Sequence, residues 1–348
     1  MSETRSSSAG RVLVGLAAMV VVCFGLRAAS GIVAPLLLAL ALTIVVHPLR
    51  TRVGRRLPTW LVSLLMLVGV YLLVGVLGLM VLVSVTQFAD LVPEYQAELQ
   101  ARVASTVDWL GSLGVSTAQI ERITGSFDIG RIADLVGSLL SGLAGVLSSF
   151  FFIATLLLFL AFDGAQTHGL LEHTRRYRPH AADAMISFAR GTRSYLSVSA
   201  VFGLIVAVID TIALAALGVP GAFVWGVLAF VTNFIPNIGF VIGVVPPALI
   251  ALLDGGFGLM LAVIVVYSVI NVVIQSIIQP RYVGDAVGLS TTLTFLSLVF
   301  WTWVLGPLGA LLAVPMSLLV RAILVEANPQ NAWMMPLISG RTEPDPGG

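Results

Sequence analysis

Charged residues are scarce in this chain: they make up 10% of its 348 residues, whereas 58% are hydrophobic. The mean hydropathy of +1.04 agrees with that imbalance. Because soluble globular domains carry about 25% charged residues, the composition argues against a soluble domain and predicts a polytopic membrane protein. The net charge of +1 supplies no basic surface, so nucleic acid is not an expected partner.

Cysteine is almost absent as well. The single one, Cys23, excludes an intrachain disulfide and a structural metal bound by several thiolates. The sequence also lacks H-E-x-x-H, G-x-S-x-G and the phosphate-binding G-x-x-x-x-G-K-[ST]. Its four histidines lie at a span end or near arginines that would repel a cation: His47, His168, His173 and His180. We therefore expect neither an enzyme nor a bound cofactor or metal.

Long apolar runs take up most of the chain. A helix needs about 20 residues to cross a bilayer, and most of the runs are long enough. The prediction is an all-α membrane protein with about eight hydrophobic segments, at residues 12–26, 28–47, 59–88, 142–162, 195–217, 222–253, 258–279 and 292–325. We expect the first run to be an uncleaved helix rather than a signal peptide, because many spans follow it.

The loops between the runs differ in charge. Residues 48–58 carry four arginines and no acid, and residues 163–194 carry five arginines against three acids. By the positive-inside rule both loops and both termini are expected in the cytoplasm. Residues 89–141 carry seven acids and three arginines, so this segment is expected outside. Its apolar residues repeat every three or four positions, which predicts an amphipathic helix that packs on the spans, lies on the bilayer or contacts a neighbouring subunit.

These features divide the chain into five parts. We expect N-terminal membrane helices at 1–88, the external helical segment at 89–141, a membrane helix with a cytoplasmic amphipathic segment at 142–194, a transport core at 195–326 and a cytoplasmic tail at 327–348. The cytoplasmic segment should be helical with an interruption at Pro179. The core stands out because two of its apolar runs are broken in the middle.

The first broken run is 222–253. Pro236, Asn237 and Gly239 interrupt it, with Asn233 just before them. Each half has about 14 residues, about 21 Å of helix against a hydrocarbon core of about 30 Å, which favours a re-entrant hairpin. In hydrocarbon a broken helix is tolerated only where protein or a water-filled cavity satisfies the freed backbone groups. Transporters hold their substrates at such breaks.

The last run repeats this pattern. Gly306, Pro307 and Gly309 break it, and in both runs the following short apolar helix is expected to close at a Val-Pro, at Pro246 and at Pro315. Matched breaks are typical of the inverted repeats of secondary transporters, so we expect two hairpins that face one another near the bilayer midplane. Prolines and glycines are also commoner in membrane helices generally, which leaves an ordinary structural interpretation open.

One ionisable residue, Asp210, lies well inside the fifth run. Such a group costs at least about 2.5 to 3.5 kcal/mol to insert and marks a functional site by default. We take Asp210 as the candidate for proton or cation coupling, with Thr211 beside it in the same polar pocket. The alternative is a structural carboxyl that is hydrogen-bonded near the outer end of its span.

Three amides, Asn271, Gln275 and Gln279, follow at intervals of four on the helix that precedes Pro280. This spacing places them on one face. Such a stripe suits a hydrated path for a neutral polar solute, and it equally suits helix-to-helix hydrogen bonds worth about 0.6 to 2 kcal/mol each. A channel and a membrane scaffold are the other classes to weigh; matched breaks favour a transporter with moving hairpins over both.

Several motifs of the C-terminal half resemble the autoinducer-2 exporter family of permeases. They are N-F-I-P-N-I-G at 233–239, V-V-P-P-A at 244–248, Q-P-R-Y-V-G-D-A-V-G-L at 279–289 and G-P-L-G-A-L-L-A-V-P at 306–315, and F-D-G at 162–164 is similar to the family's pattern. The likeness covers most of the chain from about residue 142. After Leu289 the chain continues with Ser290 and Thr291, where many members place His-Pro.

The resemblance implies a permease of the bacterial inner membrane with about eight hydrophobic segments, assembled as a homo-oligomer, with a pentamer as the expected number. Members of the family are associated with export of autoinducer-2 and, in other branches, with sodium/proton exchange. We therefore expect a secondary permease that exports a small polar, autoinducer-2-like molecule. The alternative is a monovalent cation (sodium)/proton antiporter.

Overall fold

A computed structural model describes residues 8–53, 167–236, 238–279 and 288–340, together with scattered positions between 61 and 86 and between 152 and 160. Every element in these residues is helical, as the apolar runs predict. Four of the described helices are long and apolar enough to cross a membrane: Ser30–Pro48, Pro179–Ala216, Gly239–Gln275 and Pro307–Glu326. The expected external segment at 89–141 lies outside the described residues.

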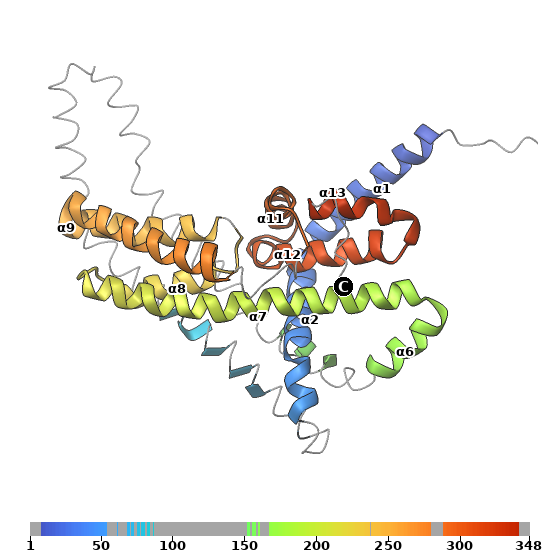
Figure 1. Cartoon of the computed structure of the whole chain (residues 1–348), viewed down its shortest axis with the longest axis horizontal. Helices are drawn as coiled ribbons and strands as arrows, with labels where there is room; N and C mark the ends of the chain where they lie inside the picture. Colours follow the sequence, from blue (N-terminus) through green and yellow to red (C-terminus); the bar gives the residue numbers. More distant parts are fainter. Residues whose placement is uncertain are drawn as a thin grey trace, which may run out of the picture. The chain divides into compact units, whose positions relative to one another are not determined.

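The chain divides into two compact units, which we describe separately. The first contains residues 1–67, 152–197 and 285–348, and the second contains residues 68–151 and 198–284. Helix α7 (Pro179–Ala216) contributes residues to both units and is a single unbroken helix (Figure 1). Its second half carries Asp210, so α7 supplies one wall of the site described below.

In the first unit, α11 (Thr291–Leu305) and α12 (Pro307–Arg321) pack against each other as a helical pair (Figure 1). Both contact α2 (Ser30–Val53), and α11 also contacts α1 (Ser8–Ala28). Val314 and Leu318 of α12 share a buried apolar cluster with Phe188 of α7. The unit ends with η2 (Ala322–Glu326), η3 (Pro329–Met334) and α13 (Met335–Ser339).

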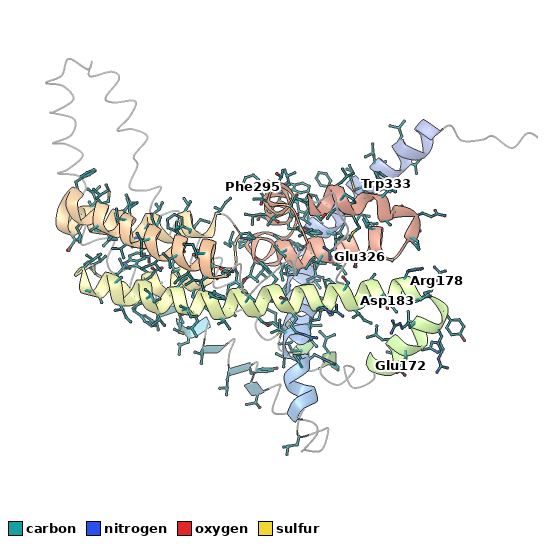
Figure 2. All side chains as sticks on the ribbon, in the orientation of Figure 1. Glu172, Arg178, Asp183, Phe295, Glu326 and Trp333 are labelled. Carbon is teal, nitrogen blue, oxygen red and sulfur yellow. The ribbon has the colours of Figure 1, made fainter. Side chains whose placement is uncertain are left out.

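The segment before α7 is helical and is interrupted where the sequence predicts. Helix α6 (Thr167–Tyr177) ends just before Pro179, which starts α7, because proline has no N–H to donate and fits the first turn of a helix. Arg175 of α6 and Asp183 of α7 form an ion pair of 3.2 Å in which both side chains are exposed. Figure 2 labels Asp183 near the start of α7. These exposed charges suit a segment that lies in water.

In the second unit, α8 (Ala222–Thr232) leads through a turn to α9 (Gly239–Asn271), which continues into the π-helical segment η1 (Val272–Ile278). Trp225 of α8 and Tyr267 of α9 are the largest members of its buried apolar cluster. Helix α9 is kinked at Gly256, whose φ of 78° and ψ of −170° favour glycine. The kink falls between the apolar runs expected to end at 253 and to begin at 258.

Both predicted breaks coincide with helix ends in the structure. The first falls between Thr232 and Gly239, and the second at Gly306, between α11 and α12. The expectation that the following helices close at Val-Pro is wrong, because Pro246 lies inside α9 and Pro315 inside α12. Each proline removes one backbone hydrogen bond, a loss that packing and local adjustment in membrane helices can offset. The re-entrant path of each hairpin remains a prediction.

Candidate functional site

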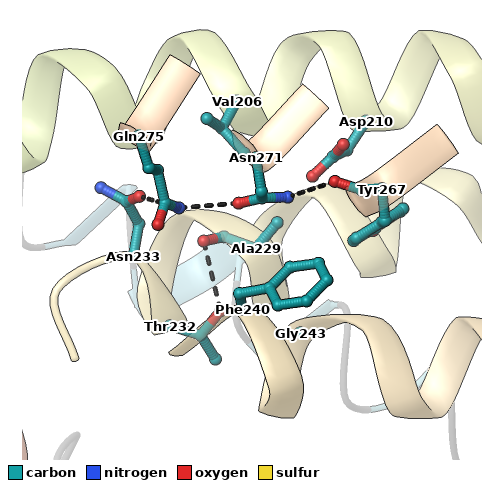
Figure 3. A pocket seen from close by; sticks show the side chains of 10 residues that line it. All are labelled: Val206, Asp210, Ala229, Thr232, Asn233, Phe240, Gly243, Tyr267, Asn271 and Gln275. Atoms are coloured by element: carbon teal, nitrogen blue, oxygen red, sulfur yellow. Dashed lines mark hydrogen bonds between the residues drawn. The ribbon is translucent and has the colours of Figure 1, made fainter. Parts of the chain in front are cut away.

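A small cavity lies within the second unit beside the break between α8 and α9 (Figure 3). Its volume is about 10 Å³, room for one water-sized group. The structure brings four predicted site residues together around it: Asp210, Asn233, Asn271 and Gln275. The remaining lining residues were not predicted from the sequence; they are Val206, Ala229, Thr232, Phe240, Gly243 and Tyr267.

The amides form a chain of hydrogen bonds through this site. Gln275 Nε2 donates to Asn271 Oδ1 at 2.7 Å and to Asn233 Oδ1 at 3.0 Å. Asn233 Nδ2 donates to the Ser199 carbonyl of α7 at 2.8 Å, and Asn271 Nδ2 donates to the Tyr267 carbonyl at 2.9 Å. The chain therefore joins α7, the first break and the α9–η1 helix. Two of these bonds, Gln275 to Asn233 and Asn233 to Ser199, join different helices, which fits the structural interpretation that the sequence left open.

Glycines on α7 and α8 permit the close packing around this chain. A Cβ on Gly203 would lie 2.9 Å from Asn233 Nδ2, too near for a real contact. Gly226 leaves room for the side chain of Thr211 in the same way. The Thr211 hydroxyl donates to the Ala207 carbonyl one turn earlier at 2.7 Å. That bond directs the hydroxyl to its own helix. Thr211 is not among the residues that line the cavity, contrary to the sequence-based expectation.

Asp210 is fully buried in the cavity wall, with 0% of its surface exposed. Neither of its carboxyl oxygens has a hydrogen-bond partner among the described residues, and the hydroxyl of Tyr267 lacks one as well. Buried polar groups nearly always have partners. The polar side chains of the site with an atom that lacks any described partner are therefore these two. Sequence reasoning missed Tyr267, although it extends the four-residue spacing of Asn271 and Gln275 by one turn.

Gln279 does not join the amide chain. It is half-buried at the end of η1 and is not among the residues that line the cavity. Gln279 follows the last residue of η1 by one position, one turn beyond Gln275. Two further predicted residues, Asn237 and Pro280, lie outside the described residues.

The predicted residues of the second break belong to the first unit, and none of them lines the cavity. Gly306 joins α11 to α12 with a φ of 70°, and Pro307 is the first residue of α12. Gly309 allows a close backbone approach at this break, as Gly239 does at the first break. A Cβ on Gly309 would overlap the Trp301 carbonyl oxygen, and one on Gly239 would overlap that of Thr232.

The chain is similar over most of its length to proteins named for transport. It is 32% identical over 320 residues to the AI-2 transport protein TqsA of Escherichia coli (strain K12), covering 90% of this chain and 91% of the relative. It is 31% identical over 328 residues to a putative transport protein of Haemophilus influenzae, covering 92% and 94%. A third relative, the putative transport protein YhhT of Escherichia coli (strain K12), is 32% identical over 311 residues, which cover 88% of each chain.

Together with the long apolar helices, these likenesses define a multi-pass membrane transporter. Residues 16–328 match the family described as AI-2E family transporter, and the chain belongs to that family. The resemblance drawn from the motifs is thereby confirmed. The match also extends through the N-terminal part, before residue 142, where none of these motifs lies.

Proposed function

We propose that this transporter is a secondary permease that exports a small polar molecule of the autoinducer-2 type across the bacterial inner membrane. The buried polar cavity beside a broken helix carries the proposal, because transporters hold solutes at interrupted helices. The name of TqsA, an AI-2 transport protein, supports the choice of solute. The cavity admits one water-sized group in this conformation, so a whole solute enters only when the helices around the break move apart.

The break supplies the means for that movement. Six residues separate the end of α8 from the start of α9, and Pro236, within them, has no backbone N–H to donate. We assign both breaks to the moving parts of the pathway, the first with Asn233, Pro236, Asn237, Gly239 and Pro246, and the second with Gly306, Pro307, Gly309 and Pro315. Asn271, Gln275 and Gln279 then belong to the helix against which the first break moves, and Pro280 follows them in the sequence.

We assign coupling to Asp210. A buried carboxyl without a hydrogen-bond partner among the described residues exchanges a proton when the cavity opens to water, whereas the amides around it do not titrate. The proton gradient would then drive the solute in the opposite direction. Two re-entrant hairpins, cytoplasmic termini and a homopentameric assembly complete the proposal, on the loop charges and the family resemblance.

Transport by the purified chain in proteoliposomes tests the function. Autoinducer-2 and sodium are compared as solutes under an imposed pH gradient, with protein-free liposomes as the background. We expect flux of autoinducer-2 above background that depends on the gradient. Gradient-dependent sodium flux without autoinducer-2 flux would refute the proposed export.

A further inference from the structure

Asp210 and Tyr267 border the same cavity from two helices, α7 and α9 (Figure 3). Their side chains are buried, with 0% and 1% of their surface exposed. Both carboxyl oxygens and the phenolic hydroxyl lack hydrogen-bond partners among the described residues. Since buried polar groups are rarely left unpaired, two such groups at one cavity indicate a ligand that both of them bind.

The size of the cavity limits that ligand. About 10 Å³ accommodates one water-sized group, and the lining includes apolar residues such as Ala229 and Phe240 beside the polar ones. Asp210 is the only charged side chain among the lining residues. The ligand is therefore one small group rather than a whole solute, and the carboxyl of Asp210 disfavours an anion.

The hydrogen-bonding chemistry limits it further. Both amide hydrogens of Gln275 donate to protein oxygens, and Asn233 and Asn271 each donate one of their two to a backbone carbonyl. The lining atoms without any partner among the described residues are the carboxyl oxygens of Asp210, which accept, and the hydroxyl of Tyr267, which donates or accepts. An O–H group fits both partners, because it donates its hydrogen to the carboxyl and accepts from the phenol through its oxygen.

We propose that Asp210 and Tyr267 together bind one O–H group. In the resting protein this group is a water molecule, and during transport a hydroxyl of the solute replaces it. The second step rests on the proposed function and narrows it, because it makes the permease selective for hydroxyl-bearing solutes. Tyr267 becomes a binding residue that orients the hydroxyl, beside the carboxyl that couples transport.

Infrared difference spectra of the full chain in nanodiscs, recorded in H₂¹⁶O and H₂¹⁸O buffers, test the site without any solute. We expect an O–H stretching band of a buried water that shifts with the oxygen isotope and is lost in both Tyr267→Phe and Asp210→Asn. Both substitutions preserve the size of the side chain. Tyr177→Phe and Asp183→Asn, which make the same chemical changes at exposed positions, should keep the band.

A band that persists in both Tyr267→Phe and Asp210→Asn, or that is missing from the wild-type protein, would contradict the proposed O–H binding site. Adding autoinducer-2 to the wild-type protein then tests whether a hydroxyl of the solute replaces the bound water. Loss of the band supports replacement by a solute hydroxyl, whereas a band that persists at saturating autoinducer-2 overturns that step. A protein that shows the water band but transports no autoinducer-2 refutes the proposed function and leaves the site itself intact.

Discussion

Gln275 donates a hydrogen bond of 3.0 Å to Asn233 and thereby joins the π-helical segment η1 to the break between α8 and α9. Forty-two residues separate the two side chains. Asn233 in turn donates to the Ser199 carbonyl of α7 at 2.8 Å. The side-chain amide of Asn233 therefore ties the break to two other helices. Both hydrogen bonds must break before the residues of the break can move away from those helices.

Asn233→Ala should lower the free energy of unfolding by about 1 to 2 kcal/mol, because it removes two hydrogen bonds, and such bonds in membrane bundles average about 0.6 kcal/mol. Reversible unfolding in mixed micelles measures the change. A double-mutant cycle with Gln275→Ala should give a coupling energy of about 0.6 kcal/mol. Gln330→Ala, at an exposed position, is the control and should be nearly silent. Strictly additive effects of the two substitutions would contradict the bond.

Gly239→Ala and Gly309→Ala should each destabilise the protein by about 1 to 3 kcal/mol, the usual cost of overpacking. In both, the new methyl group would overlap the carbonyl oxygen of the preceding helix. Gly258→Ala in α9 is the matched control, since nothing lies within 4 Å of its Cβ position. Thermal unfolding in detergent measures all three. Equal melting temperatures for Gly239→Ala and Gly258→Ala would contradict the close approach at the break.

Pro236→Ala and Pro307→Ala should reduce autoinducer-2 flux in proteoliposomes while membrane insertion stays intact. Alanine restores an N–H group and allows helical conformations that proline and its neighbours avoid. The residues of each break can then adopt a helical backbone and close the interruption. Flux is compared at matched protein levels. Pro336→Ala, at an exposed position in the first turn of α13, provides the control. Wild-type flux in both variants would reduce the breaks to ordinary irregularities of membrane helices.

Asp210→Asn should leave a folded protein whose flux no longer depends on a pH gradient. The amide has nearly the same size and can hydrogen-bond, but it cannot titrate. Flux of autoinducer-2 is measured with and without an imposed gradient, with Asp183→Asn as the control at an exposed carboxyl. Among the lining residues, Tyr267 is the other titratable group that borders Asp210. Unchanged gradient dependence in the Asp210 variant would remove this carboxyl from the coupling mechanism.

The topology is tested by cysteine labelling in a Cys23→Ser background. A cysteine at His180, exposed at the start of α7, should react with a membrane-impermeant maleimide only after the cells are opened. A cysteine at Thr117 should react in intact cells, because the acidic segment around it is expected outside. The opposite pattern would invert the orientation.

The sequence by itself determined the helical class, the positions of the two breaks and the membership of a permease family. Each of these follows from local chemistry. Apolar side chains over about 20 residues favour a membrane helix, and proline and glycine favour a helix end through a missing donor or a positive φ. Gly306 and Pro236 therefore marked the breaks before any neighbour was known. Pro246 and Pro315 also lack a donor but lie inside α9 and α12, so a proline by itself did not fix where a helix ends.

Only the tertiary structure decided which polar residues meet. Tyr267 looked like one more aromatic residue of an apolar run until its hydroxyl was found at the same cavity as Asp210. Gln279 looked equivalent to Asn271 and Gln275, but only the latter two are among the residues that line the cavity. The physical reason is that a hydrogen bond is satisfied or left open by atoms within about 3.5 Å, and packing brings those atoms together from helices far apart in sequence.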